Sequence, residues 1–341
     1  MYEEITYEES LKKKNTIYID VRTPKEYNDY TIPGSINIPV LLNNEREEIG
    51  TLYKNGEIDK AKQVGVNSIS KRLPQVFAQF LELYNNYEDV YIFCSRGGYR
   101  SSALAGLLFS MDIKVHKIHG GYKKYRKYII NENNKMMQNI IPIVLYGNTG
   151  TGKTEILKEL KRRGYPVIDL EKNSNNRGSV LGAVGLGKPN TQKYFESLLH
   201  EELKNINNKY VFIEGESKRI GNIFIPDILF DKMKNGIHVN ITSPLDNRVE
   251  LLYNEYVNNN DTELRNALEP LRRYMPSEKI DKYNMCFDNG DYKSVIKDLC
   301  INYYDNNYKS KNREFKYNFN NTDVSKCVDN IIYTFDKYFS E

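Results

Sequence analysis

A cysteine opens the stretch of this chain whose residue types suit covalent chemistry. Cys94 begins the segment Cys-Ser-Arg-Gly-Gly-Tyr-Arg, which follows an apolar run at 89–93 and precedes a small-residue helical pattern at 101–108. The glycines let backbone N–H groups point inward, and the helix start adds unpaired amides and a positive dipole end. Such a loop binds an anion and favours thiolate, the nucleophilic form of cysteine. We expect Cys94, Arg96 and Arg100 to be catalytic, in an anion loop completed by Ser95, Gly97, Gly98, Tyr99 and Ser101. The alternative is an inert, buried cysteine at a strand end, which would not need two glycines and two arginines beside it.

A second motif is the segment 147–154, Gly-Asn-Thr-Gly-Thr-Gly-Lys-Thr. It matches the G-x-x-x-x-G-K-[ST] phosphate loop, and it lies between an apolar run at 140–146 and an amphipathic pattern at 155–160. The glycines let amides wrap a di- or triphosphate, Lys153 counters its charge, and Thr154 can offer its hydroxyl to a magnesium ion. The predicted phosphate-binding residues are Gly147, Asn148, Thr149, Gly150, Thr151, Gly152, Lys153 and Thr154.

Two polar segments follow the phosphate loop. The segment 175–179 holds an arginine beside a glycine, and an apolar strand pattern at 209–213 ends in acidic residues, as a Walker B element does. We expect Glu214 or Glu216 near the metal and Arg219 facing anions; the alternative is an ordinary strand followed by a solvated turn. The candidates for this second part of the site are Asn176, Arg177, Gly178, Ser179, Glu214, Glu216, Ser217 and Arg219.

The helical pattern that extends from 244 to about 299 contains a pair of basic residues. Arg272 and Arg273 could contact RNA phosphates, although such a pair on a helix is usually a solvated face. Cys286, Cys300 and Cys327 lie in apolar or helical surroundings without a basic loop, so we expect structural roles for them. The tail from 303 to 341 ends in an amphipathic pattern and contains no chemistry that we can identify.

These motifs need two α/β domains to position them. The chain has 341 residues, too many for one typical core. Strand patterns at 17–22 and 115–118 accompany the cysteine loop, and patterns at 165–171 and 238–241 accompany the phosphate loop. The polar, non-periodic segment 131–135 indicates a boundary. We therefore expect one domain at 1–133 and a parallel-sheet, P-loop NTPase-like domain with a helical C-terminal part at 138–341.

The composition excludes several classes of protein. Charged residues make up 28% and hydrophobic residues 40%, and the sequence lacks a long apolar stretch and a basic leader before an apolar segment, so we expect a cytoplasmic protein without membrane contact. Four widely spaced cysteines and four histidines indicate neither a disulfide framework nor a zinc site. A net charge of +4 is only a weak indication of a nucleic-acid partner, and the oligomeric state stays open.

The first half of the chain resembles rhodanese domains. The resemblance rests on Asp-Val-Arg-x-Pro-x-Glu-Tyr at 20–27, Ile-Pro-Gly-Ser-Ile-Asn-Ile-Pro at 32–39, the cysteine loop, and a Gly-Gly turn within 119–126. It implies an α/β domain that holds a persulfide or thiolate on the loop cysteine, in which Asp20 and Arg22 serve structure near the loop.

Across both halves, five short sequence motifs, in the order in which they occur, resemble those of the bacterial tRNA 2-selenouridine synthase family. They are Gly-Thr-Leu-Tyr-Lys, Cys-x-Arg-Gly-Gly-x-Arg-Ser, Gly-x-Thr-Gly-x-Gly-Lys-Thr, Asn-x-Arg-Gly-Ser and Glu-Ser-x-Arg-Ile-Gly, over roughly residues 5–310. This chain departs from the family at two positions: Ser95 stands where an aromatic residue is common, and Lys218 stands where an arginine is common. The resemblance implies a transferase that replaces sulfur by selenium at C2 of the wobble 2-thiouridine of tRNA. Selenophosphate would be the donor, geranyl diphosphate would supply an activating group, and we expect no tightly bound cofactor.

The spacing Cys94-x5-Arg100 is one residue longer than in sulfur-transferring rhodaneses and suits a tetrahedral, phosphate-like anion such as selenophosphate. The phosphate loop binds polyphosphates generally, so geranyl diphosphate and ATP or GTP stay open as its ligand. Two other functions also stay open. One is a rhodanese-fold phosphatase or arsenate-reductase-like enzyme, and the other is a regulatory P-loop protein with a non-catalytic rhodanese module.

Overall fold

The computed structural model describes residues 2–257, 260–307 and 314–339, and the chain divides into two compact units. The first unit extends to Glu132 and includes the short segment Glu196–Leu198, and the second contains the rest. Each unit is built on a parallel five-stranded sheet with helices on both faces, which confirms the predicted α/β class.

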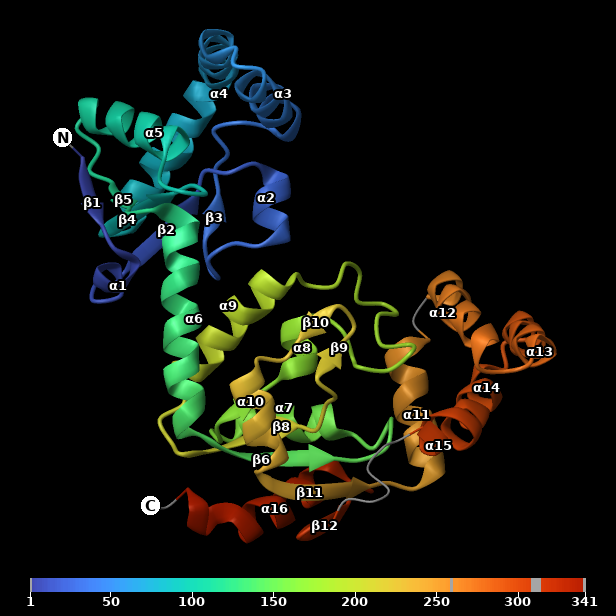
Figure 1. Ribbon diagram of the computed structural model, residues 1–341. Coiled ribbons are helices and arrows are strands. Elements are labelled where there is room, and N and C mark those ends of the chain that lie inside the picture. Colours follow the sequence, from blue (N-terminus) through green and yellow to red (C-terminus); the bar gives the residue numbers. More distant parts are fainter. Residues whose placement is uncertain (1, 258–259, 308–313, 340–341) are drawn as a thin grey trace. The chain divides into compact units, whose positions relative to one another are not determined.

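The sheet of the first unit has the strand order β1-β5-β4-β2-β3 (Figure 1). Its central strand β4 is buried on both faces, as expected of a parallel sheet that helices cover. The carboxyl end of β4 leads directly into the cysteine loop. The strands are β1 (Glu3–Ile5), β2 (Thr16–Asp20), β3 (Ile36–Asn37), β4 (Asp89–Phe93) and β5 (His116–Ile118).

Two apolar clusters hold helices against this sheet. One face packs against α3, α4 and α5 through residues such as Phe80 and Leu108, and the other packs against α1 and the first turns of α6 through Tyr7 and Tyr125. Helix α2 begins with Pro24 after a capping box between Thr23 and Glu26. The helices are α1 (Tyr7–Ser10), α2 (Pro24–Asp29), α3 (Asn43–Lys54), α4 (Ile58–Asn86), α5 (Tyr99–Ser110) and α6 (Gly121–Asn139).

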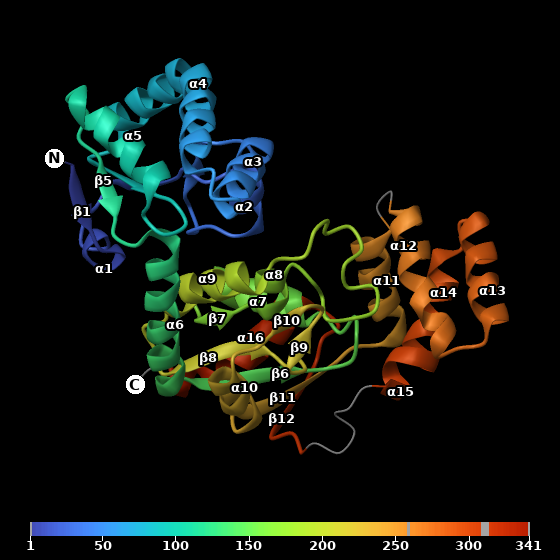
Figure 2. The same cartoon turned by 45° about the horizontal axis from the view of Figure 1, so that its top comes forward.

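The sheet of the second unit has the strand order β12-β11-β6-β8-β7 (Figure 2). Strand β6 lies in the middle, between β11 and β8, and its carboxyl end leads into the phosphate loop. The strands are β6 (Ile141–Tyr146), β7 (Val167–Ile168), β8 (Tyr210–Glu214), β11 (Ile237–Thr242) and β12 (Tyr317–Asn320), and a separate antiparallel hairpin is formed by β9 (Arg219–Ile220) and β10 (Ile223–Phe224).

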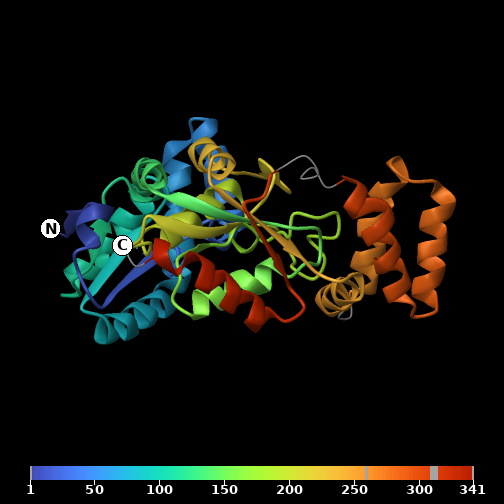
Figure 3. The same cartoon turned by 90° about the horizontal axis from the view of Figure 1, so that it is seen from below.

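Helices cover both faces of this second sheet. On one face α7 and α16 lie side by side over a cluster that includes Leu160 and Phe335 (Figure 3). On the other face α9 and α10 pack against the sheet through Leu199 and Leu229. The helices are α7 (Lys153–Arg162), α8 (Leu170–Ser174), α9 (Gln192–Leu203), α10 (Asp227–Lys234), α16 (Val324–Phe335) and the 3-10 turn η4 (Asp336–Tyr338).

A third apolar cluster of the second unit joins the helices that follow β11. Tyr256 lies in this cluster and reaches the edge of the phosphate site, so the helical part contributes a wall to that site. Its elements are α11 (Leu245–Tyr256), α12 (Asp261–Leu268), η1 (Glu269–Arg273), α13 (Ser277–Asp288), α14 (Tyr292–Leu299), η2 (Cys300–Tyr304) and α15 (Asp305–Asn307).

The chain divides after Glu132, within the segment 131–135 and inside the continuous helix α6. Two other segments differ from the sequence expectation. The strand pattern at 165–171 is wrong in extent: β7 has only two residues, and Asp169 then caps α8 by accepting from the N–H of Lys172. The tail supplies β12, which pairs in parallel with β11, a long-range pairing that local pattern does not show. No helix among the described residues is both long and apolar enough to cross a bilayer.

Candidate functional site

The cysteine loop lies between β4 and α5 and is held from outside by the Gly-Gly turn. The N–H of Tyr122 donates to the carbonyl oxygen of Cys94 at 2.9 Å, and that of Lys123 donates to the carbonyl oxygen of Ser95 at 3.0 Å. A Cβ at Gly121 would lie 2.1 Å from the Cys94 oxygen and 2.6 Å from the Gly97 nitrogen, so only glycine fits there. The turn therefore sets the shape of the loop.

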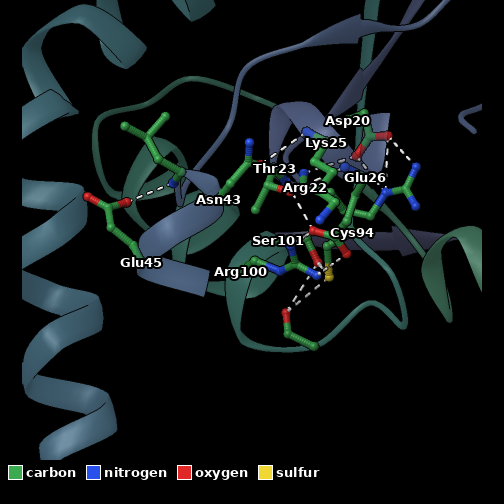
Figure 4. A network of polar contacts seen from close by, with 12 residues as sticks. Asp20, Arg22, Thr23, Lys25, Glu26, Asn43, Glu45, Cys94, Arg100 and Ser101 are labelled. Carbon is green, nitrogen blue, oxygen red and sulfur yellow. Dashed lines mark hydrogen bonds and ion pairs between the residues drawn. The ribbon is translucent and has the colours of Figure 1, made fainter. Parts of the chain in front are cut away.

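Cys94 lies under the loop, and the whole residue is only 3% exposed. Its partners are the Ser101 hydroxyl at 3.2 Å and the Gly98 carbonyl at 3.9 Å (Figure 4). Burial alone would raise the pKa of Cys94, but hydrogen bonds from Ser101 and the backbone N–H of Arg96, together with the charge of Arg100, lower the pKa overall. The sulfur is thus buried, as in the alternative interpretation, and yet stabilised as thiolate, as a nucleophile requires.

The two arginines of the loop lie in different environments. Arg96 is exposed, and Tyr99 beside it is 80% exposed at the surface of the loop. Arg100 is largely buried and donates to Glu26 at 2.5 and 3.1 Å (Figure 4). Burial acts to raise the pKa of Glu26, but Arg100 holds it below its ordinary value, so this carboxylate stays charged. Glu26, which the sequence analysis did not select, therefore orients Arg100.

Asp20 and Arg22 form a fully buried ion pair behind the loop. The Arg22 guanidinium donates to Asp20 at 2.6 Å and to the carbonyl oxygen of Tyr30 at 2.6 Å, and lies over the rings of Tyr30 and Tyr122. A buried pair costs stability if one partner is removed, so it fixes the local chain path. This placement agrees with the structural role that the rhodanese resemblance implies.

The phosphate loop lines a cavity of about 460 Å³ in the second unit. Lys153 reaches back to the loop and donates to the carbonyl oxygen of Gly147 at 2.8 Å. Of the predicted loop residues, Asn148 and Thr151 do not line the cavity, and Thr151 is buried. Those that do are Gly147, Thr149, Gly150, Gly152, Lys153 and Thr154.

The acid that faces the phosphate loop is Glu171, which the sequence analysis did not select. Thr154 donates to its carboxyl oxygen at 2.9 Å, and Glu216 is hydrogen-bonded to it. Burial and the nearby charge of Glu216 raise the pKa of Glu171 to about 8. An apolar strand pattern that ends in an acid is the sequence signal that could have identified Glu171. The same pattern ends at Glu214, and only the order of the strands in the sheet decides which acid faces the loop.

Glu214 and Glu216 occupy distinct positions. Glu214 is 2% exposed, lies outside the cavity lining and accepts from the N–H of Glu171 at 2.6 Å. Burial and the charges of Asp169 and Glu171 raise its pKa well above the ordinary value. Glu216 and Ser217 line the cavity, so of the two predicted acids Glu216 lies in the phosphate site and Glu214 lies behind it.

The segment after α8 supplies another wall of the cavity. Arg177 lines it, pairs with Glu255 at 2.6 Å and lies over the ring of Tyr256. Gly178 and Ser179 also line it, while Asn176 is buried behind them and accepts from the N–H of Gly178.

Arg219 is placed elsewhere. It is exposed on the β9–β10 hairpin, donates to the carbonyl oxygen of Gly221 at 2.7 Å, and is absent from the cavity lining. The structure therefore does not bring Arg219 into this cavity, because the hairpin turns its side chain toward its own backbone.

Two residues from distant segments support the phosphate loop. Arg248 of α11 donates to the carbonyl oxygen of Thr149 at 2.9 Å and pairs with Asp305. Asn321, which follows β12, donates to the carbonyl oxygen of Thr151 at 2.8 Å. The expectation of a tail without identifiable chemistry is therefore corrected, since its asparagine holds the loop.

The candidate RNA contacts and the remaining cysteines lie outside both loops. Arg272 is engaged by Glu269 and Asp281, each at 2.7 Å, whereas Arg273 is exposed. Burial raises the pKa of Cys300, and that of Cys327 to about 11, which disfavours thiolate in both and agrees with structural roles.

Comparisons with known proteins match both units. A family model described as the tRNA 2-selenouridine synthase AAA domain matches residues 140–276, and the Rhodanese-like domain model matches 6–128.

Among curated relatives, the tRNA 2-selenouridine synthase of Nitrosomonas eutropha is 34% identical over 73% of this chain and 65% of its own length. The tRNA 2-selenouridine synthase of Hydrogenovibrio crunogenus is 30% identical over 82% of this chain and 81% of its own. Among solved structures, one is the N-terminal domain of a protein described as ATP/GTP binding, from Clostridium difficile 630. Its sequence is 39% identical to this chain, the match covers 37% of this chain and 98% of that domain, and the TM-score is 0.37.

Proposed function

We propose that this chain, which belongs to the tRNA 2-selenouridine synthase family, replaces sulfur by selenium at C2 of the wobble 2-thiouridine of tRNA. The observation that supports this most is the presence of a cysteine loop and a phosphate loop in one chain. In one, hydrogen bonds from Ser101 and the Arg96 backbone favour the thiolate of Cys94, and the other has a cavity beside it. Replacement of a sulfur by a selenium needs an activated leaving group and a selenium donor, and each site suits one of them.

In the first step, the phosphate loop binds geranyl diphosphate. The 2-thiouridine sulfur attacks C1 of the geranyl group, the carbon–oxygen bond to the diphosphate breaks, and the diphosphate leaves with the electron pair. Lys153 and the loop amides stabilise the charge on the leaving diphosphate. Leu251, Leu252 and Tyr256 give the same cavity an apolar wall for the prenyl chain.

The oxygen groups near Lys153 fit a magnesium ion. The Thr154 hydroxyl and the Glu171 carboxylate lie 2.9 Å apart, with Glu216 next to them. Magnesium keeps waters and substrate phosphate oxygens in its shell, so one or two protein oxygen ligands are sufficient to hold it. When bound, it would neutralise diphosphate charge.

In the second step, the Cys94 thiolate attacks the phosphorus of selenophosphate. A sulfur–phosphorus bond forms, the phosphorus–selenium bond breaks, and selenide leaves. Selenide adds to C2 of the geranylated base and expels geranylthiolate, and water then hydrolyses the phosphocysteine. Arg100 and the loop amides stabilise the phosphoryl oxygens, and the wobble base of an anticodon loop is accessible because it is single-stranded.

The proposal is tested by mass spectrometry of wobble nucleosides from selenium-grown cells with and without the gene. With purified protein, Cys94→Ala should abolish selenation and leave geranylation intact, whereas Lys153→Ala should abolish geranylation. Selenation that survives Cys94→Ala would refute the role of this cysteine. Isothermal titration of the protein with geranyl diphosphate and with ATP identifies the ligand of the phosphate loop. Tight ATP binding without a response to geranyl diphosphate would overturn the assignment of geranyl diphosphate to this loop.

A further inference from the structure

A second chamber of about 490 Å³ adjoins the phosphate-loop cavity within the second unit. Its volume falls in the range of about 300–1,000 Å³ that is typical of small-ligand sites. The two hollows have a common boundary, and the residues that line both are Thr154, Glu155, Glu171, Arg177, Leu251 and Glu255. A group bound in one chamber would therefore lie next to a group bound in the other.

The two chambers are lined by different kinds of side chain. Beside its phosphate loop, the first has the apolar and aromatic side chains of Tyr146, Leu252 and Tyr256. The residues that line only the second are, with one exception, able to form hydrogen bonds: Lys158, Asp169, Lys172, Asn175, Leu186 and Asn254. Such a lining offers donors and acceptors to the edge of a flat ring, and the carbon atoms that make up most of its surface can pack against the faces of that ring.

Fixed side chains form the walls of the second chamber. Asn175 donates to the carbonyl oxygens of Leu186 and Lys188 at 2.8 and 2.9 Å, which ties α8 to the loop that follows it. Arg177 donates to the carbonyl oxygen of Val184 at 2.8 Å and pairs with Glu255 on α11. The chamber is thus held between two segments by hydrogen bonds and an ion pair, most of them partly buried.

Two exposed lysines could meet the phosphates of a nucleic acid at this chamber. Lys158 and Lys172 are exposed and line this chamber and not the first. Acids line it as well, and two of them are paired, Glu155 with Lys158 and Glu255 with Arg177. Lys172 is thus placed to meet a phosphate that flanks an extruded nucleotide, while the hollow accepts its base.

We infer that the second chamber is the acceptor subsite, where a nucleobase of the RNA substrate binds beside the diphosphate donor. This inference rests on the proposed function, since prenyl transfer needs the acceptor sulfur about 3–3.5 Å from the reacting carbon. The sulfur–carbon bond then forms across the boundary of the chambers, the carbon–oxygen bond to diphosphate breaks, and the N3 proton of the thiouracil passes to solvent.

A tryptophan placed in the second chamber tests the assignment. Asn254 is exposed on α11 and lines only this chamber, and Asn247 is exposed on the same helix outside both. The assay is single-turnover geranyl transfer to a 2-thiouridine anticodon stem-loop. In Asn254→Trp we expect the transfer rate to fall at least 100-fold, while the affinity for geranyl diphosphate stays within twofold of wild type. Asn247→Trp should match wild type in transfer rate and in affinity. Retained transfer in Asn254→Trp, or a selective loss of geranyl diphosphate affinity, would overturn the assignment, the latter because the chamber would then hold the prenyl chain.

A measurement that does not depend on activity separates this inference from the proposed function. A stem-loop with photoreactive 4-thiouridine at the wobble position is crosslinked to the wild-type protein, and the attached peptide is identified by mass spectrometry. Attachment to the segments 169–175 or 251–255 supports the acceptor subsite even if wild type transfers no geranyl group, in which case only the proposed function fails. Attachment elsewhere, in a protein that does transfer geranyl, refutes the subsite and leaves the function standing.

Discussion

The ammonium group of Lys117 donates to the carbonyl oxygen of Gly97 at 3.0 Å, from the strand next to the one that leads into the cysteine loop. Lys117 is buried, also donates to Ser102 at 2.9 Å and pairs with Glu4. With the Gly97 carbonyl turned toward this lysine, the neighbouring amides are free to face an anion. The lysine is a positioning residue that the sequence motifs do not reveal.

Substitution of Lys117 by Met should therefore weaken the anion loop. A hydrogen bond to a charged group contributes about 1.5–3 kcal/mol, so we expect selenophosphate affinity and selenation to fall about tenfold or more. Geranyl transfer should not change, since Lys117 lies in the other unit. The matched control is Lys114→Met, which alters an exposed lysine. Equal selenophosphate affinity in the two variants would argue against a positioning role.

Ser101→Ala should shift the titration of Cys94. Burial opposes ionisation, and the hydrogen bonds of Ser101 are the leading contribution that lowers the pKa of Cys94. Wild-type thiolate should thus persist to a lower pH than an ordinary thiol, and selenation should decline only as pH falls through that lowered pKa. In Ser101→Ala the titration curve of Cys94 and the pH profile of selenation should both move to higher pH. The titration is followed by the ultraviolet absorbance of thiolate, from which the signal of Cys94→Ala is subtracted. Ser110→Ala, at an exposed position, is the control. A titration midpoint that does not move in Ser101→Ala would contradict the role of Ser101.

Asn321→Ala should weaken the phosphate loop from a distance. Its side chain donates to the Thr151 carbonyl, and a Cβ on Gly152 would lie 2.3 Å from its amide nitrogen, so the contact is close. Loss of one hydrogen bond of about 1 kcal/mol predicts roughly fivefold weaker binding of geranyl diphosphate in isothermal titration. Asn320→Ala, at an exposed neighbouring position, is the control and should bind as wild type does. Unchanged affinity in Asn321→Ala would show that the loop keeps its shape without the tail.

Glu171→Gln should change how stability depends on pH. Burial, followed by the charge of Glu216, raises the pKa of Glu171 from its ordinary value of 4.5 to about 8. The folded protein then holds a proton that the unfolded chain releases, so the free energy of unfolding falls as pH rises from about 5 to about 8. Glu171→Gln removes this pH-dependent decrease in the free energy of unfolding, because glutamine does not ionise. Without magnesium or diphosphate, its Tm should equal that of wild type near pH 5 and exceed it near pH 8. Glu278→Gln, at an exposed site on α13, should follow wild type throughout, and parallel curves for all three proteins would contradict the prediction.

The sequence by itself determined both anion loops, because each is a local strand–loop–helix unit. The position of Cys94 before two glycines, and of Lys153 after three, is sufficient to predict where amides gather and which side chain meets the anion. It also determined the α/β class and the family, since apolar strands and motif order are readable along the chain.

Only the tertiary structure decided which distant residues complete these loops. Lys117 reaches the cysteine loop from β5, the neighbour of β4, whereas Glu171 and Asn321 reach the phosphate loop from the segments after β7 and β12, the two edge strands of the second sheet. The order β12-β11-β6-β8-β7 is set by long-range pairing. The same geometry turned Arg219 toward its own hairpin, and it placed Glu216 in the cavity lining and Glu214 outside it. Local pattern specifies which residues can form a strand or a turn, but the side chains that meet at the end of a sheet depend on which strands become neighbours, and that is settled by burial across the whole unit.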